Sequence, residues 1–264
     1  MVLPNIDIIN GVTGLEIILS GYILGFILIF KHARKAPNNK VKKKIILRGV
    51  GIISVFQAWF GVSGSFVLIL LGFPPLGFPG GNPNVGVLGY AWGPALGIPI
   101  WTWVAMDTLK EGRYKIPMKR IMTGIMAILS IAFAFLIYSN PSKYAKWQCP
   151  EEGGIDTGCL AGTGFRLPET GIRSTALILL FLMLVIMMIL LGPTIIYSGL
   201  KMEDRSNKWR RYSLGIGLTM ASLFGIIDAA LGADELGGPI GLAIIKAFIF
   251  TSIFLIYEGV DKGT

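Results

Sequence analysis

Seven apolar stretches separated by short polar segments dominate the pattern of hydrophobic and polar positions. They cover approximately residues 13–30, 49–71, 86–106, 121–138, 174–199, 213–232 and 239–257. Each stretch approaches the ~20 residues that an α-helix needs to cross a ~30 Å hydrocarbon core. The pattern therefore predicts an all-α integral membrane protein, a seven-transmembrane-helix bundle that forms one domain over residues 1–264.

Basic residues follow the first, third and fifth apolar stretches. Most of the 24 Lys and Arg fall at residues 31–48, 108–120 and 201–211. Short loops rich in Lys and Arg stay in the cytoplasm, so we expect the N-terminus outside, the C-terminus inside and a multi-pass location in the cell membrane. We expect no cleaved signal peptide, because no basic region precedes the first apolar stretch and cations follow it.

The composition agrees with a membrane protein. Hydrophobic residues make up 53% of the chain and charged residues 15%, against roughly 25% charged in a typical soluble domain. The net charge of +9 would suggest a nucleic-acid partner in a soluble protein. Here the membrane topology explains the excess of cations, so we expect membrane lipids and no nucleic acid as partners.

The longest predicted exterior loop, residues 139–173, contains both cysteines of the chain, Cys149 and Cys159. A disulfide is allowed on the exterior side of a cell membrane, and two cysteines in one loop favour it over two free thiols. A metal site that also used Glu151 and Glu152 is disfavoured, because two cysteines at this spacing are a weak metal motif.

A stripe of glycines marks the third apolar stretch. Gly89, Gly93 and Gly97 recur every four positions, with Pro94 and Pro99 beside them. On a helix this spacing forms one face without side chains, against which another helix can pack closely. We favour close packing, and the alternative is a hinge or a ligand cleft beside a kinked helix.

Three ionisable side chains lie inside the apolar stretches: Glu16, Asp228 and Lys246. Such residues are costly in a membrane and are candidates for a functional site. Asp228 and Lys246 lie on consecutive antiparallel helices at comparable depth, so we expect an ion pair. A purely structural pair and a ligand or proton site, with Glu16 in the same leaflet, both remain open interpretations.

Lys246 in a seventh helix is similar in position to the Schiff-base lysine of retinal proteins. The resemblance stops there, because Leu242 stands one turn before Lys246 where microbial rhodopsins usually have Asp. The sixth stretch lacks the Trp and Pro that shape a retinal pocket, and the third has no carboxylate in mid-membrane. Retinal binding is therefore disfavoured.

Catalytic motifs are nearly missing from the sequence. His32 is the single histidine and lies among cations at a membrane edge, which excludes a His-based catalytic triad and a haem held by two histidines. We therefore expect no catalytic residues, no metal and no cofactor, and an enzyme is not among the favoured classes.

The favoured function is a non-catalytic subunit of a larger membrane complex, with other membrane subunits or further copies as partners. The alternatives are a small-solute transporter or channel, and a seven-helix sensor for a small apolar ligand.

Overall fold

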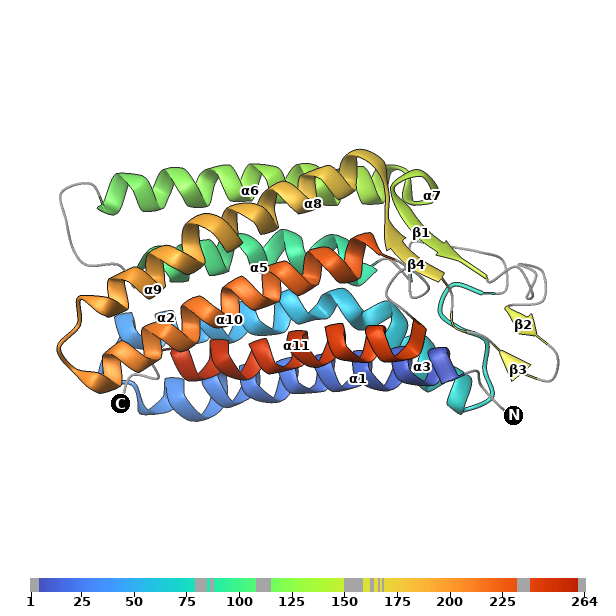
Figure 1. Cartoon of the computed structure of the whole chain (residues 1–264), viewed down its shortest axis with the longest axis horizontal. Helices are drawn as coiled ribbons and strands as arrows, with labels where there is room; N and C mark the ends of the chain where they lie inside the picture. Colours follow the sequence, from blue (N-terminus) through green and yellow to red (C-terminus); the bar gives the residue numbers. More distant parts are fainter. Residues whose placement is uncertain are drawn as a thin grey trace.

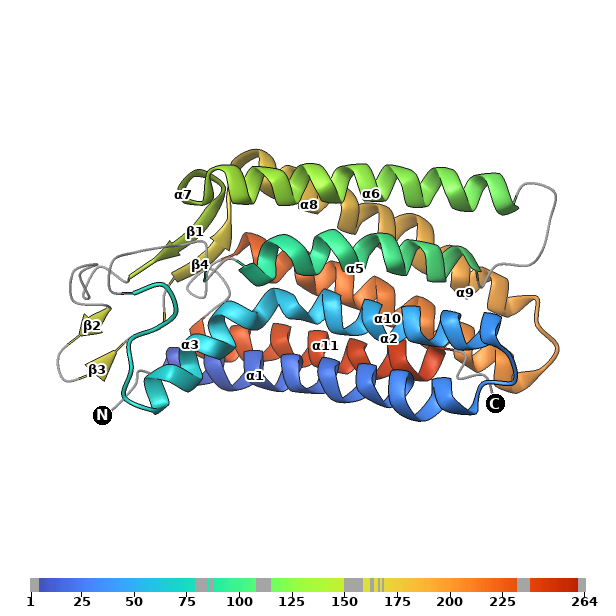
Figure 2. The same ribbon diagram turned by 180° about the vertical axis from the view of Figure 1, so that it is seen from behind.

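The protein folds into a bundle of long helices with a small region of strands at one end (Figure 1; Figure 2). The computed structural model describes residues 5–78, 85, 88–107, 115–149, 159–161, 164–165, 167, 169–231 and 238–260. The long helical segments run roughly along one common direction, as expected of a membrane helical bundle.

The first two segments are longer than the apolar stretches that predicted them. The first comprises α1 (Asn5–Phe26), a π-helical turn η1 (Ile27–His32) and a 3-10 turn η2 (Ala33–Lys35). The second comprises α2 (Asn39–Phe56), a 3-10 turn η3 (Gln57–Trp59) and α3 (Phe60–Leu70). The extension of α2 into the basic segment has a local cause, because the side chain of Asn38 caps the helix by accepting a hydrogen bond from the Val41 N–H at 2.9 Å.

The remaining long segments follow the predicted order. They are α5 (Leu88–Asp107), α6 (Lys115–Ser139), α8 (Ser174–Ile186), a π-helical turn η5 (Met187–Leu191), α9 (Gly192–Leu200), α10 (Arg205–Ala230) and α11 (Gly238–Gly259). The helix predicted at 213–232 begins earlier because Asp204 caps α10, accepting hydrogen bonds from the backbone N–H groups of Ser206 and Asn207.

Within the described residues, six helical segments are long and apolar enough to span a membrane. The helix α5 is not among these six, although it has 20 residues. Its glycines, prolines and tryptophans lower its mean hydropathy. The helix packs between α2 and α6, and many of its side chains, including Trp101 and Val104, are buried by protein. A helix covered by protein does not need the apolarity of one that faces lipid.

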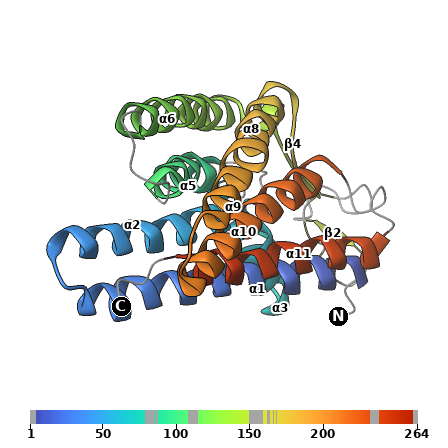
Figure 3. The ribbon, with the colours of Figure 1, turned by 60° about the vertical axis from the view of Figure 1, so that its left-hand side comes forward.

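The helices form layers in which α10 and α11 pack together beside α1 (Figure 3). The helix α1 also contacts α2 and α3, and α5 connects α2 to the outer helix α6. The segments 31–48 and 201–211, which are rich in Lys and Arg, surround the turns from η2 to α2 and from α9 to α10, and both turns lie at the same end of the bundle (Figure 1). We call it the basic end.

The opposite end contains the predicted loop 139–173, which has its own secondary structure. A short helix α7 (Pro141–Tyr144) leads into β1 (Ala145–Gln148), which pairs antiparallel with β4 (Glu169–Ile172). The strands β2 (Leu160–Ala161) and β3 (Gly164–Phe165) form a second antiparallel pair. The all-α class thus describes the bundle, to which the loop adds four short strands.

The predicted disulfide is confirmed, because Cys149 and Cys159 are joined. It links the segment after β1 to the start of β2. Glu151 and Glu152, which entered the disfavoured metal hypothesis, lie outside the described residues. No group of three or more His, Cys, Asp or Glu side chains that could hold a metal is found in the described part of the chain.

Candidate functional site

The second helical segment is interrupted where η3 joins α2 to α3. The glycine stripe of α5 lies against this interruption. A Cβ atom built on Gly89 would lie 2.2 Å from the carbonyl oxygen of Gln57, and one on Gly93 would lie 2.7 Å from that of Ser54. Such distances do not occur for real side chains, so only glycine allows these two backbones to come this close.

The third glycine of the stripe makes the same kind of contact. A Cβ atom on Gly97 would lie 2.8 Å from the backbone nitrogen of Val55. Pro94 and Pro99 are inside α5, which the structure describes as one helix from Leu88 to Asp107. The interruption therefore lies in the helix opposite the prolines, at Gln57–Trp59.

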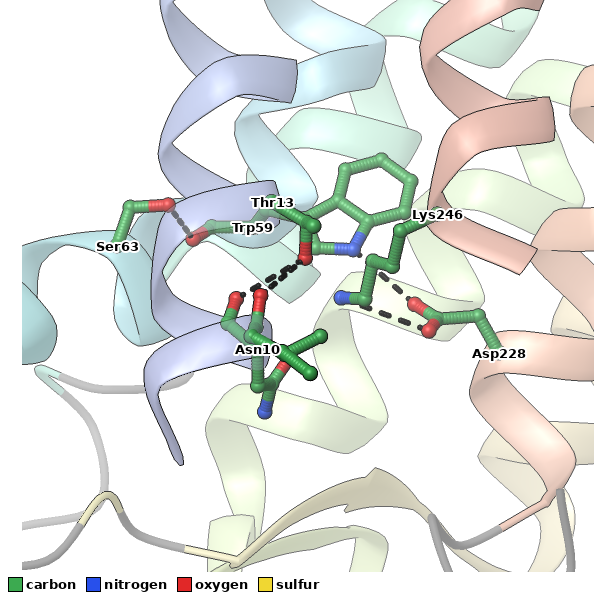
Figure 4. Close-up of polar contacts among 7 residues, drawn as sticks. Asn10, Thr13, Trp59, Ser63, Asp228 and Lys246 are labelled. Atoms are coloured by element: carbon green, nitrogen blue, oxygen red, sulfur yellow. Dashed lines mark hydrogen bonds and ion pairs between the residues drawn. The ribbon is translucent and has the colours of Figure 1, made fainter. Parts of the chain in front are cut away.

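Three side chains from three segments meet beside the interruption (Figure 4). The indole Nε1–H of Trp59, on η3, donates a hydrogen bond to Oδ2 of Asp228, on α10, at 3.0 Å. The ammonium of Lys246, on α11, lies 3.5 Å from Oδ1 of the same carboxylate. It also lies 5.6 Å from the centre of the Trp59 ring, within the range of a cation–π contact. We call these three residues the charge cluster.

The charge cluster is largely shielded from the surroundings of the protein. The side chain of Lys246 is 3% exposed and that of Asp228 is 17% exposed. Each carboxylate oxygen has one partner, and the buried ammonium lies against a carboxylate and an aromatic face. A buried pair of this kind contributes little net stability, but the loss of either member leaves the other charge uncompensated.

Other polar groups surround the interruption. The hydroxyl of Tyr22, on α1, donates a hydrogen bond to Oε1 of the buried Gln57, and the hydroxyl of Ser63 donates to the carbonyl of Trp59 at 2.9 Å. Thr13 of α1 lies beside the charge cluster in Figure 4, but its hydroxyl donates to the carbonyl of Ile9 within its own helix. Several polar groups inside the bundle thus gather at the interruption.

Glu16 does not join this cluster. Its side chain is exposed on the outer surface of α1 and makes no hydrogen bond or ion pair with any described residue. Sequence reasoning placed Glu16, Asp228 and Lys246 in one leaflet and considered a single site. The structure brings the last two together and leaves Glu16 on the surface.

Sequence reasoning also missed two residues of the site, Trp59 and Gln57. A signal for Gln57 was available, because an uncharged polar side chain in an apolar stretch also needs a partner in a membrane. Trp59 had no comparable signal. Its contact with Asp228 depends on the 3-10 turn, which directs the indole toward α10.

A second group of charges lies at the basic end. The carboxylate of Asp107, at the end of α5, lies 2.7 Å from the ammonium groups of both Lys44 and Lys119. Burial raises the pKa of Asp107, but the hydrogen bonds and positive charges of Lys119 and Lys44 outweigh it and lower the pKa to about 2. These contacts connect α5 to α2 and α6.

Comparisons with protein-family models, with curated proteins and with solved structures find no match.

Proposed function

We propose that this chain is a non-catalytic integral subunit of a larger membrane assembly. The observation that carries the proposal is Glu16, a carboxylate exposed among apolar side chains on α1. A charged group that faces lipid is costly, and such groups normally face protein or a water-filled cavity. A partner that covers this face of α1 removes the cost.

The small number of ionisable residues in the seven predicted apolar stretches supports a structural role. Their ionisable residues, apart from tyrosine, are Glu16, Asp228 and Lys246, if the predicted limits of the apolar stretches are used. Asp228 and Lys246 satisfy each other. This leaves few groups that could form a polar pathway or an active site.

We further propose that α5 crosses the membrane as a seventh span and that the N-terminus lies outside. The segments 31–48 and 201–211, which are rich in Lys and Arg and meet at one end of the bundle, support this topology. We expect single cysteines placed at Asn38, Lys115 and Ser206 to be protected from an impermeant thiol reagent in intact cells, and one at Thr163 to be labelled. Labelling of the first three would reverse the proposed orientation.

The subunit proposal is tested by native purification in mild detergent, with the mass of the particle measured before and after covalent crosslinking. We expect a stable particle that contains a second kind of chain in fixed stoichiometry. A particle that contains only this chain, at the mass of one copy or of several, would contradict the proposal.

A transporter is the second candidate, because a specific observation favours it. Helices interrupted within the membrane form the binding sites of many transporters, and here polar groups of the charge cluster lie at the interruption η3. If the purified chain alone moves protons or small ions across vesicle membranes, and Lys246→Met abolishes the movement without unfolding the protein, the transporter is the better description.

A further inference from the structure

The outer face of α1 and η1 carries a straight row of exposed side chains. We call it the α1 row, and its members are Val12, Glu16, Leu19, Ile23, Phe26 and Phe30. Successive members are four, three, four, three and four residues apart. This alternation is the spacing that lets one helix pack along another with a small crossing angle.

Glu16 is the polar member of an otherwise apolar row. It lies 15 residues before Lys31, which corresponds to about 22 Å along the helix. With Lys31 at one edge of a hydrocarbon core of ~30 Å, the carboxylate lies about 8 Å inside the other edge. An ionised carboxylate at this depth requires a cation or hydrogen-bond donors.

The outer face of α6 provides an internal comparison. Its exposed side chains Ile121, Ile128 and Phe135 are all apolar, and lipid chains are sufficient to cover them. A helix face covered by lipid requires no carboxylate. The α1 row differs from such a face at one position, Glu16.

Within the predicted apolar stretches, a second copy of this chain offers no free cation to Glu16. Lys246 is the single Lys or Arg within the apolar stretches, and it is buried against Asp228 inside its own bundle. Two copies that met through their α1 rows would instead bring two carboxylates together. The charges inside the membrane sum to one uncompensated negative charge per chain, so the complementary group must come from a different chain.

We infer that the α1 row binds a membrane-spanning helix of a different protein, and that this helix presents a Lys or Arg to Glu16. The inference rests on the proposed function and specifies the chemistry of the partner. A single polar position within an apolar seam fixes the register of the two helices. The basic residue of the partner should therefore lie about 8 Å, or five to six residues, inside the exterior end of its apolar span.

The inference can be tested with two synthetic single-span peptides of Leu and Ala. One carries Lys at the matching depth and the other carries Met at the same position. Each is reconstituted with the full-length protein, labelled at its N-terminus, in vesicles of zwitterionic phosphatidylcholine, and association is measured by energy transfer. We expect the Lys peptide to bind roughly tenfold more tightly than the Met peptide, since polar contacts between membrane helices are worth ~1–2 kcal/mol.

Two variants of the protein locate the contact. Glu16→Gln should bind both peptides equally, whereas Phe135→Gln, which adds an amide to the outer face of α6, should keep the preference for Lys. Equal binding of the two peptides to the unchanged protein would overturn the inference, and so would a preference for Lys that survives in Glu16→Gln.

The failure of the inference and the failure of the proposed function are distinguishable. If native purification yields a second kind of chain, and Glu16→Gln retains that chain in full, the protein is a subunit but the α1 row is not its contact with a cation. If native purification yields this chain alone, the proposed function itself is wrong, whatever the peptides do.

Discussion

Two charged sites at nearly the same depth of the bundle have opposite surroundings, because one is buried with partners and the other is exposed. The hydroxyl of Ser63, which donates to the carbonyl of Trp59, would lie 3.2 Å from a Cβ atom on Gly14. Glu16 is two residues further along α1, a rise of about 3 Å. Inside the bundle, Asp228 has a cation and an indole donor. On its outer surface, Glu16 has no partner among the described residues. This contrast is the basis of the proposal that a partner covers the outer face of α1.

The largest effect in this comparison should come from breaking the ion pair. We expect Lys246→Met and Asp228→Asn each to lower the free energy of unfolding by roughly 3–5 kcal/mol, because each leaves a buried charge without its counterion. The double variant should recover part of the loss. Unfolding of the purified protein by denaturant, measured for all four members of the cycle, gives the coupling energy. Losses that simply add would show that the two charges do not interact.

Trp59→Phe should have the next largest effect. The substitution keeps an aromatic ring but removes the Nε1–H that donates to Asp228. Loss of a hydrogen bond to a charged group costs roughly 1.5–3 kcal/mol. The matched control is Trp209→Phe, since Trp209 is exposed at the basic end, and its stability should change little. A loss in Trp59→Phe that is no larger than in the control would remove Trp59 from the charge cluster.

The ion pair could be predicted from the sequence because it depends on two facts that hydropathy provides: the ends of consecutive helices and the depth of each residue within them. The contact of Trp59 could not be predicted, because it depends on a 3-10 turn of three residues. No Gly or Pro within that turn indicates it in the sequence. The residues that pack against this turn, Gly89 and Gly93, belong to another helix, so the local sequence around Trp59 does not reveal the contact.

The exposure of Glu16 could not be predicted for a different reason. In a soluble protein, the polar face of a helix points to solvent, and periodicity reveals that face. In a membrane, the faces toward lipid and toward protein are both apolar, as in α1, where buried Ile17 and exposed Leu19 are equally hydrophobic. The hydropathy pattern therefore predicts the position of Glu16 along its helix, but not whether its side chain faces lipid or protein.

Asp107 is a third charged site, at the basic end of the bundle. Its contribution to the free energy of unfolding should be smaller than that of the charge cluster. Its pKa is about 2 in the folded protein, below the ~3.9 of an unfolded chain. The carboxylate therefore stabilises the fold above about pH 4, and this contribution is lost as the pH falls toward 2. We expect only about 1 kcal/mol, because Lys44 is 41% exposed and water screens the pair.

Thermal unfolding of the unchanged protein and of Asp107→Asn between pH 6 and pH 2 measures this contribution. The difference in stability between the two proteins should be constant down to about pH 4 and should shrink below it. If Asp107→Asn is instead the more stable protein at pH 6 and loses that advantage as the pH falls, Asp107 is destabilising in its ionised form and the two lysines do not compensate its burial.

Glu16→Gln should have the smallest effect on the isolated protein. The side chain has no partner among the described residues and makes no buried contact, so its replacement should change the free energy of unfolding by no more than about 0.5 kcal/mol, as for other surface sites. Denaturant unfolding of the purified chain measures this change, with Lys246→Met as the contrasting variant from the same depth. A loss of several kcal/mol in Glu16→Gln would reveal an internal partner, and the contrast between the two charges would disappear. A small effect would agree with the proposal, because a carboxylate that is costly in lipid and that does not stabilise its own fold is expected to serve a contact outside the chain.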